Sequence, residues 1–379
     1  MARTTRPIYV PALRLKQGEY RGLQRLAPDV ANKIVPRLVV PPPKERDPEK
    51  QRLLTKDEIV YETGRRIANH WIMRDAFLDV RFLFKEFGES ECIDWLPRMF
   101  DVARKANAKP IPVLSLADAL GLRAVAFRQA LAIEGATKVA IRIESGEIDK
   151  ELAGRVTVAM SALGVASSDC TILADFADAD FSDAIAVANI AQAALEDLQG
   201  IGRWGQVVFQ GTNYPEVNPA EPDDSAVVPR NEWLAWKEAI KLDGGSPEHL
   251  VFGDYGADCA KFEFKKASGG IPIRHYRYTT PDSWLVVRGV AAGQADVVMR
   301  GVCERILKSG KFAGRGFCSA DDYIFKTAKG WDGPGNGSTW REINTAHHIT
   351  RVVRDIGGIK GMSFTQTTFS DPADQPSFL

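Results

Sequence analysis

Short apolar runs recur along the chain at a nearly constant interval, and this spacing restricts the possible folds more than any other feature. The runs begin near Ile8, Ile34, Phe77, Ile111, Lys138, Cys170, Gln206 and His249. Their mean spacing of about 34 residues is close to that of a βαβ unit, which needs roughly 30 residues or more. Alternating strands and helices predict an α/β protein with a parallel sheet.

Segments with helical periodicity lie between these runs, at 56–70, 91–106, 123–135, 148–163, 184–198 and 229–240. The number of strand–helix units is the number that closes a (β/α)8 barrel of the TIM type. We therefore predict this barrel. An open, doubly wound parallel sheet is the alternative, because it is built from the same units.

The run 138–144 shows how the strand residues sort between the two faces of such a barrel. Val139, Ile141 and Ile143 form an apolar face that can receive helices, whereas Arg142 and Glu144 lie on the other face. Sorted in the same way, the inward polar residues of the other runs are Arg14, Lys16, Arg37, Asp79, Arg81, Ser115, Asp175, Gln210 and Asp254. They fall late in nearly every run, where the mouth of a barrel holds its ligand site. A ring of structural ion pairs inside the barrel is the alternative.

The last third of the chain departs from the regular pattern. We expect one barrel domain over 1–357, with an insertion over roughly 258–337 after the eighth strand, and a polar tail over 358–379. Two strand-like runs within the insertion, 271–278 and 284–288, flank a Thr-Thr-Pro-Asp-Ser turn and predict a β-hairpin. 

Three further segments complete the organisation of the chain. Residues 216–229 form a polar, proline-rich excursion after the seventh strand. Helical patterns at 294–309 and 339–355 follow the hairpin, and either helix could close the barrel.

The charges balance, with 49 Lys and Arg against 49 Asp and Glu, which argues against bulk electrostatic binding to nucleic acid or to a membrane surface. An apolar content of 45% excludes a disordered chain. The N-terminal residues lack the apolar core of a signal peptide, and no run is long enough to span a membrane. The cysteines lie far apart, without a disulfide or zinc spacing: Cys92, Cys170, Cys259, Cys303 and Cys318. We expect a cytoplasmic protein.

The mixed charges of the expected mouth suggest a small anionic or zwitterionic ligand. Lys16, Arg81 and Arg142 are the expected anion clamps, and Arg37 and Gln210 are further ligand contacts. Arginine offers paired donors that suit phosphate or carboxylate. Asp79, Glu144 and Asp175 are candidate acid–base groups. His348 shares a helical face with Arg341 and is a fourth candidate if that face meets the mouth. We expect no metal and no cofactor, because the histidines lack ligand spacing and the cations would compete for the carboxylates.

Several motifs together resemble the "beta protein" family, which is named after a protein of T-even bacteriophage. They are Tyr9-Val-Pro with Lys16-x-Gly-Glu19-Tyr20, Phe252-Gly-Asp254-Tyr255, Tyr276-Arg277-Tyr278 with Trp284–Gly289, and Trp340-Arg341 with His347-His348. The resemblance implies a role in phage–bacterium conflict or mobile elements, without an established activity. The residues carried over by motif, without assigned roles, are Lys16, Glu19, Asp254, Tyr255, Arg277, Trp340, Arg341 and His348.

Two classes of function remain open from the sequence. The first is an enzyme, a hydrolase or transferase that acts on a phosphorylated or nucleotide-like substrate. The second is a non-catalytic barrel that recognises a small ligand or a partner protein, with the surface near 274–288 as the contact region.

Overall fold

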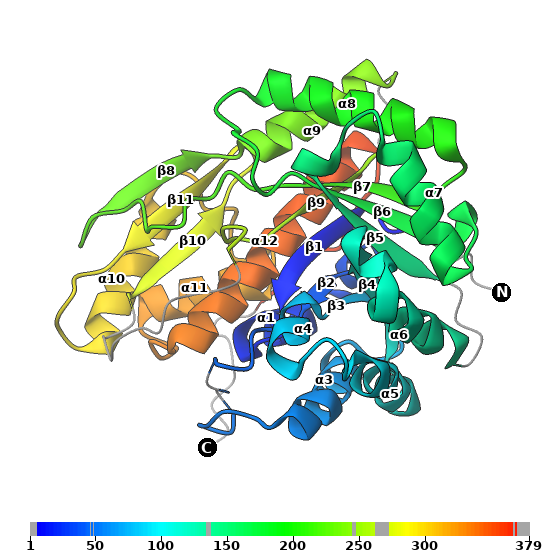
Figure 1. Ribbon diagram of the computed structural model, residues 1–379. Helices are drawn as coiled ribbons and strands as arrows, with labels where there is room; N and C mark the ends of the chain where they lie inside the picture. The colour runs from blue at the N-terminus through cyan, green and yellow to red at the C-terminus, as the bar shows by residue number, and fades with distance from the viewer. Residues whose placement is uncertain are drawn as a thin grey trace.

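A closed barrel of eight parallel strands forms the centre of the computed structural model, which describes residues 6–45, 47, 49–133, 138–244, 248–261, 273–366 and 368–369. In order around the barrel the strands are β1 (Tyr9–Arg14), β2 (Arg37–Val39), β3 (Asp75–Asp79), β4 (Lys109–Ser115), β5 (Val139–Glu144), β6 (Cys170–Asp175), β7 (Gln206–Gln210) and β9 (Val251–Asp254). Strand β9 pairs with β1 and closes the ring. The predicted (β/α)8 barrel is therefore confirmed, and the open sheet is wrong (Figure 1).

Helices follow the strands and cover the outside of the barrel (Figure 1). Up to the last barrel strand they are α1 (Gln17–Gln24), α2 (Pro28–Ala31), α3 (Lys56–His70), α4 (Arg81–Phe87), α5 (Cys92–Lys105), α6 (Gly121–Ala132), α7 (Leu152–Leu163), α8 (Ala184–Ile201) and α9 (Asn231–Leu242). Helix α3 has the bounds that the periodicity predicts, and the others predicted begin or end within a few residues of expectation. Within the described part of the chain, no helix combines the length and the apolar character needed to cross a bilayer.

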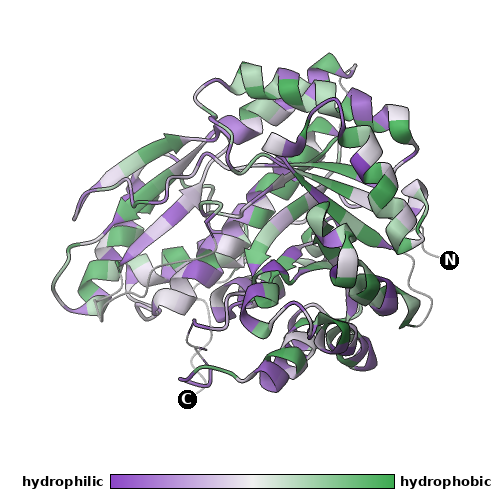
Figure 2. Cartoon of the chain, viewed as in Figure 1, coloured by the Kyte–Doolittle hydropathy of each residue, from purple (hydrophilic) through white to green (hydrophobic). Residues whose placement is uncertain are grey.

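Two apolar layers line the two faces of the barrel wall, as the alternation in the sequence predicts. In β5, Val139, Ile141 and Ile143 belong to the outer core that receives the helices. Ala140 belongs to a separate cluster inside the barrel, together with Phe77 of β3. The strands are accordingly mostly apolar along their length, and polar residues gather toward their ends (Figure 2).

The third strand ends before Arg81, which the sequence predicts on its inward face. It ends at Asp79, and Arg81 begins helix α4, so the prediction that Arg81 belongs to the strand is wrong. The carboxylate of Asp79 accepts a hydrogen bond from the backbone N–H of Arg81 at 3.1 Å. This local bond favours a turn over continued strand pairing.

A second, three-stranded sheet stands beside the barrel (Figure 1). The predicted hairpin provides β10 (His275–Thr279) and β11 (Ser283–Arg288), and residues 262–272 of the expected insertion lie outside the described residues. The third strand, β8 (Ser225–Pro229), comes from the excursion after β7 and pairs antiparallel with β11. This strand was not predicted, because its pairing partner lies far along the chain and only one of its faces is half-buried. Helices α10 (Ala295–Lys308) and α11 (Ser319–Lys329) pack on this unit.

Of the two late helices that the sequence leaves open, α12 (Gly337–Ile359) is the one that packs against the barrel strands. It runs between the barrel and the three-stranded sheet, and it contacts α1, β1 and β10 (Figure 1). Two glycines of α1 permit the close approach of the helices. A Cβ atom at Gly22 would lie 2.7 Å from Cβ of Thr345, and one at Gly18 would lie 2.7 Å from the carbonyl oxygen of Ser338.

Candidate ligand site at the barrel mouth

The floor of the barrel mouth is a buried polar network centred on Arg37, whose side chain is 0% exposed. Its Nη2 donates to Oδ2 of Asp79 at 2.7 Å, and its Nη1 donates to Oδ2 of Asp175 at 3.2 Å. Nη1 also donates to Oε1 of Gln210. Arg142 Nη1 donates to the same oxygen of Asp175 at 3.4 Å. The strand ends thus bring these predicted residues together from five different strands.

Burial disfavours the charged form of every group in this network, and the ion pairs offset that effect. The carboxylates of Asp79 and Asp175 hold the pKa of Arg37 above its usual value despite its burial. Burial acts to raise the pKa of Asp79, but Arg37 and Arg81 lower it to about 2. Arg37 and Arg142 likewise lower the pKa of Asp175 against the effect of burial. Both carboxyl groups stay ionised at neutral pH, which favours a positioning role over the predicted acid–base role.

A cavity of about 340 Å³ opens above this network at the C-terminal ends of the strands. Its lining includes Arg81, Arg142, Glu144, Asp175 and Tyr255. Arg142 Nη1 donates to Oε1 of Glu144 at 2.6 Å, and the Glu144 side chain is 50% exposed. The Tyr255 hydroxyl donates to Asp175, and burial followed by this carboxylate raises the pKa of the tyrosine. The mouth therefore combines guanidinium groups with accessible carboxylates. Glu144 is the one that Arg142 holds, and the exposed residues Asp178 and Glu216 also line the cavity.

A second cavity of about 490 Å³ adjoins the mouth, and Tyr255 lines both cavities. Besides Tyr255, the predicted residues in its lining are Glu19, Arg277, Trp340 and Arg341. The two arginines meet at Asp258, whose Oδ1 lies 2.5 Å from Arg277 Nη1 and whose Oδ2 lies 2.6 Å from Arg341 Nη1. Arg341 Nη1 also donates to Oε1 of Glu19 at 2.9 Å. 

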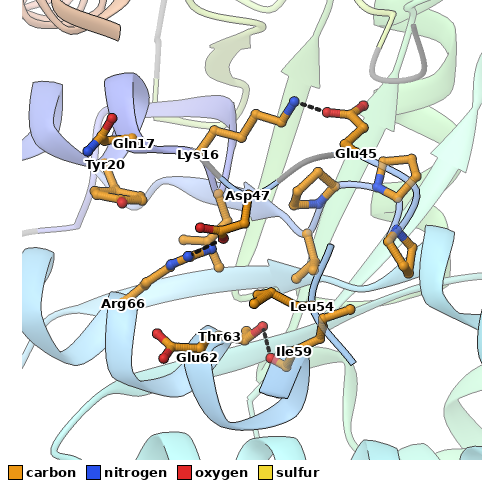
Figure 3. A pocket seen from close by; sticks show the side chains of 15 residues that line it. Lys16, Gln17, Tyr20, Glu45, Asp47, Leu54, Ile59, Glu62, Thr63 and Arg66 are labelled. Carbon is orange, nitrogen blue, oxygen red and sulfur yellow. Dashed lines mark hydrogen bonds and ion pairs between the residues drawn. The ribbon is translucent and has the colours of Figure 1, made fainter. Parts of the chain in front are cut away.

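Lys16 lies apart from both cavities, so its predicted place in the mouth is wrong. Its ammonium group pairs with Glu45 in the loop after β2, beside the ion pair of Asp47 with Arg66 (Figure 3). The pocket that these residues line has a volume of only about 40 Å³. That space admits a few water molecules and no metabolite. Lys16 no longer belongs to the strand, because β1 ends at Arg14 and Lys16 is the N-cap of α1.

Asp254 and His348 lie on the outer side of the barrel wall, so their predicted place in the mouth is also wrong. Asp254 follows Gly253 in β9 and shares the outer face with Phe252, which is part of the core between barrel and helices. Asp254 Oδ1 accepts from the Tyr9 hydroxyl at 2.5 Å, and Asp254 Oδ2 lies 2.9 Å from Nε2 of His348. Both residues are 0% exposed, and burial lowers the pKa of His348. The pair joins the last barrel strand to α12.

Glu232, at the start of α9, gives this outer region a pH dependence that can be measured. Burial raises the pKa of Glu232 from 4.5 to about 8, and the guanidinium of Arg230 opposes this only in part. A carboxyl group with a raised pKa in the folded state contributes stability that is complete below pH 4.5 and is lost as the pH rises through 8. We expect Glu232→Gln to flatten this fall in the free energy of unfolding. Urea unfolding at pH 5, 6.5 and 8.5 measures it, and parallel curves for the two proteins would contradict it.

The main site residue that the sequence analysis missed is Asp258, which organises the second cavity. It lies two residues after Gly256, where the regular strand pattern has ended and the insertion begins. Lys261, which lines the mouth cavity, was missed for the same reason. A carboxylate next to a strand end was the available signal, but only the fold brings three arginines around it.

The fold and the site together define the class of protein: a (β/α)8 barrel with a cavity above a buried ion-pair network at its C-terminal mouth. A comparison with family models places the chain more closely. The chain belongs to the Beta protein family, whose model matches residues 9–354 and so includes both the barrel and the second sheet. This confirms the resemblance drawn from the motifs. A comparison with curated proteins found no significant match.

Proposed function

We propose that the mouth cavity binds a small anionic or zwitterionic ligand, and that Arg81 and Arg142 hold its phosphate or carboxylate group. The observation that carries this proposal is the cavity of about 340 Å³ at the C-terminal strand ends, the place where (β/α)8 barrels hold their substrates. Within the described residues, both ion pairs of Arg142 use Nη1. Donors on Nε and Nη2 can therefore serve a planar, charged ligand group.

The volume and the buried floor set the class of ligand. A cavity near 340 Å³ is at the small end of the range of metabolite sites, which begins at about 300 Å³. Arg81 lies 3.8 Å from Asp79 and Arg142 lies 3.4 Å from Asp175 before a ligand arrives, so little ordering is required on binding. A phosphorylated or nucleotide-like small molecule fits both conditions.

A catalytic role is supported by one carboxylate in particular. Glu144 lines the cavity, its side chain is 50% exposed, and Arg142 fixes it at 2.6 Å. A carboxylate that is both positioned and accessible can accept a proton from water or from a substrate hydroxyl. The corresponding reaction is hydrolysis or group transfer on the bound phosphorylated molecule, with Glu144 as the base and the arginines as anion clamps.

A thermal-shift screen of the full-length protein tests the binding proposal. The probes are inorganic phosphate, a sugar phosphate, AMP and ATP, each added in steps to the wild-type protein. A ligand at 100 times its Kd stabilises the folded state by about 2.7 kcal/mol, which corresponds to a rise in Tm of roughly 3 °C for a chain of this length. Arg81→Ala should abolish this rise.

Arg155→Ala is the matched control. Arg155 is a half-buried arginine of α7 that lies outside the cavity and pairs with Asp149, which precedes the helix. This variant should keep the full shift. Glu144→Gln should also keep it and lose turnover of the ligand, if the bound molecule is a substrate. A shift that survives in Arg81→Ala would show that the ligand binds elsewhere.

A second candidate function is a barrel that recognises a ligand or a partner protein without chemistry. Glu144→Gln separates the two candidates. An enzyme should lose turnover of the ligand in this variant, whereas a binding protein shows no turnover in either form. On the family resemblance alone, we further propose that either activity serves phage–bacterium conflict or mobile elements.

A further inference from the structure

Three chemically different ligand groups converge in the core beside the second sheet, away from both cavities. They are Cys318 and Asp321 at the start of α11 and His347 in α12. The thiol sulfur lies 3.0 Å from Asp321 Oδ2, and Nδ1 of His347 lies 3.0 Å from the same oxygen. One sulfur, one oxygen and one nitrogen atom of the three side chains all lie within 4.8 Å of one another.

Hydrogen bonds from outside the cluster orient its two polar members. Nε2 of His347 lies 2.8 Å from the backbone carbonyl oxygen of Thr279, which can only accept. The ring therefore carries a proton on Nε2, and a neutral ring presents the lone pair of Nδ1 to the carboxylate. The Tyr278 hydroxyl donates to Oδ1 of Asp321 at 2.6 Å and leaves Oδ2 facing the histidine. Two lone pairs that face each other at 3.0 Å require a cation between them, either a proton or a metal ion.

We propose that Cys318, Asp321 and His347 bind a divalent transition-metal ion, with Zn²⁺ as the ion that suits the ligands best. A thiolate, an imidazole and a carboxylate are the three side-chain ligands that Zn²⁺ takes in proteins. The second partners of His347 and Asp321 match the outer hydrogen bonds that orient metal ligands elsewhere. Tetrahedral Zn²⁺ sets its ligand atoms about 3.3–3.7 Å apart. Oδ2 of Asp321 therefore needs to move a few tenths of an ångström away from the sulfur and from Nδ1.

The position of the cluster indicates a structural role for the ion. Cys318, Asp321 and His347 are 8%, 0% and 1% exposed, so a substrate has no access. The ligands join α11 of the insertion to α12, the helix that closes the barrel. A bound ion would hold the second sheet and its helices against the barrel. This inference does not depend on the proposed ligand site, because the two share no residue.

The metal content of the full-length protein tests the proposal. The protein is purified without chelators from zinc-supplemented cells and measured by plasma mass spectrometry. We expect about one equivalent of Zn²⁺ in the wild-type protein and less than a tenth of that in Cys318→Ser and Asp321→Asn. Cys303→Ser is the matched control, because Cys303 is a buried cysteine of the same core and is 0% exposed. It should keep the full equivalent.

Replacement by Co²⁺ gives a second readout that does not require a variant to fold. The wild-type protein loaded with Co²⁺ should show the near-ultraviolet charge-transfer band of a cobalt–thiolate bond, and Cys318→Ser should lack it. Wild-type protein that holds no metal and develops no such band would overturn the proposal and leave the cluster held by protons alone. Equal metal content in Cys318→Ser and Cys303→Ser would overturn it as well, because the ion would then lie elsewhere.

Discussion

Replacing Arg37 with alanine should lower the free energy of unfolding by about 3–5 kcal/mol, the cost of removing one partner from a buried ion pair. The substitution leaves the carboxylates of Asp79 and Asp175 inside the barrel without their central cation. The remaining cations lie farther away, with Arg142 at 3.4 Å from Asp175 and Arg81 at 3.8 Å from Asp79, so they compensate the carboxylates less closely. The expected fall in Tm is roughly 4–6 °C for a chain of this length, and urea unfolding at pH 7 gives the free energy directly.

A second arginine serves as the control for the stability loss in Arg37→Ala. Arg155→Ala removes an equally charged side chain whose partner Asp149 is about half exposed, and its cost should stay within about 1 kcal/mol. Arg37→Leu combined with Asp79→Leu should recover part of the loss, because it removes both partners of the closest pair. If Arg37→Ala unfolds no more easily than Arg155→Ala, the network is not a structural centre of the barrel.

Replacing Asp258 with asparagine should cost a similar amount, again about 3–5 kcal/mol. Asp258 is the shared partner of Arg14, Arg277 and Arg341, so its loss leaves three close cations with less neutralising charge. Burial acts to raise the pKa of Asp258, and the arginines, Arg277 first, hold that pKa far below its ordinary value of 3.8. The stability that this carboxylate contributes is therefore complete above pH 3.8 and is lost as the pH falls below it.

The pH dependence of the stability deficit distinguishes a lost charge from a packing defect at Asp258. The deficit of Asp258→Asn relative to wild type should shrink by about 1.4 kcal/mol for each pH unit below the unfolded-state pKa. Urea unfolding at pH 7 and pH 3 measures the deficit at both ends. Asp149→Asn, which alters an exposed carboxylate, serves as the control and should change little. A deficit of constant size would show that the variant suffers from lost packing rather than lost charge.

The barrel itself could be predicted from the sequence because its signal is local and repeated. Strands such as β5 each show an alternation of residues between the two faces of the sheet. The helices between consecutive strands indicate that the strands are parallel. Strand β8 could not be predicted in this way. It alternates between half-buried and exposed residues, and its hydrogen-bonding partner β11 is separated from it in the chain by α9, β9 and β10.

The site residues show the same difference between local and long-range signals. Polar residues within a barrel strand or at its end, such as Arg142, Asp79 and Asp175, were placed correctly because alternation along a strand decides which face a side chain occupies. The prediction for Asp254 did not follow this alternation. Asp254 lies two residues after the outward-facing Phe252, so β9 presents Gly253 and Tyr255 inward and sends Asp254 to the helices. Lys16 was misplaced because the strand had already ended at Arg14. The cluster of Cys318, Asp321 and His347 has no local signal, because its members approach only after α11 and α12 pack.

The late position of α12 has a consequence for synthesis on the ribosome. The last barrel strand ends at Asp254, whereas the helix that covers the seam of β1 and β9 begins only at Gly337. At about 5–20 residues per second, roughly 4 to 16 s pass between the two. Throughout that time the apolar outer face of β1, including Tyr9, lacks its cover. The nascent chain therefore exposes an apolar surface to which a chaperone can bind. A product truncated before α12 would expose the same surface permanently.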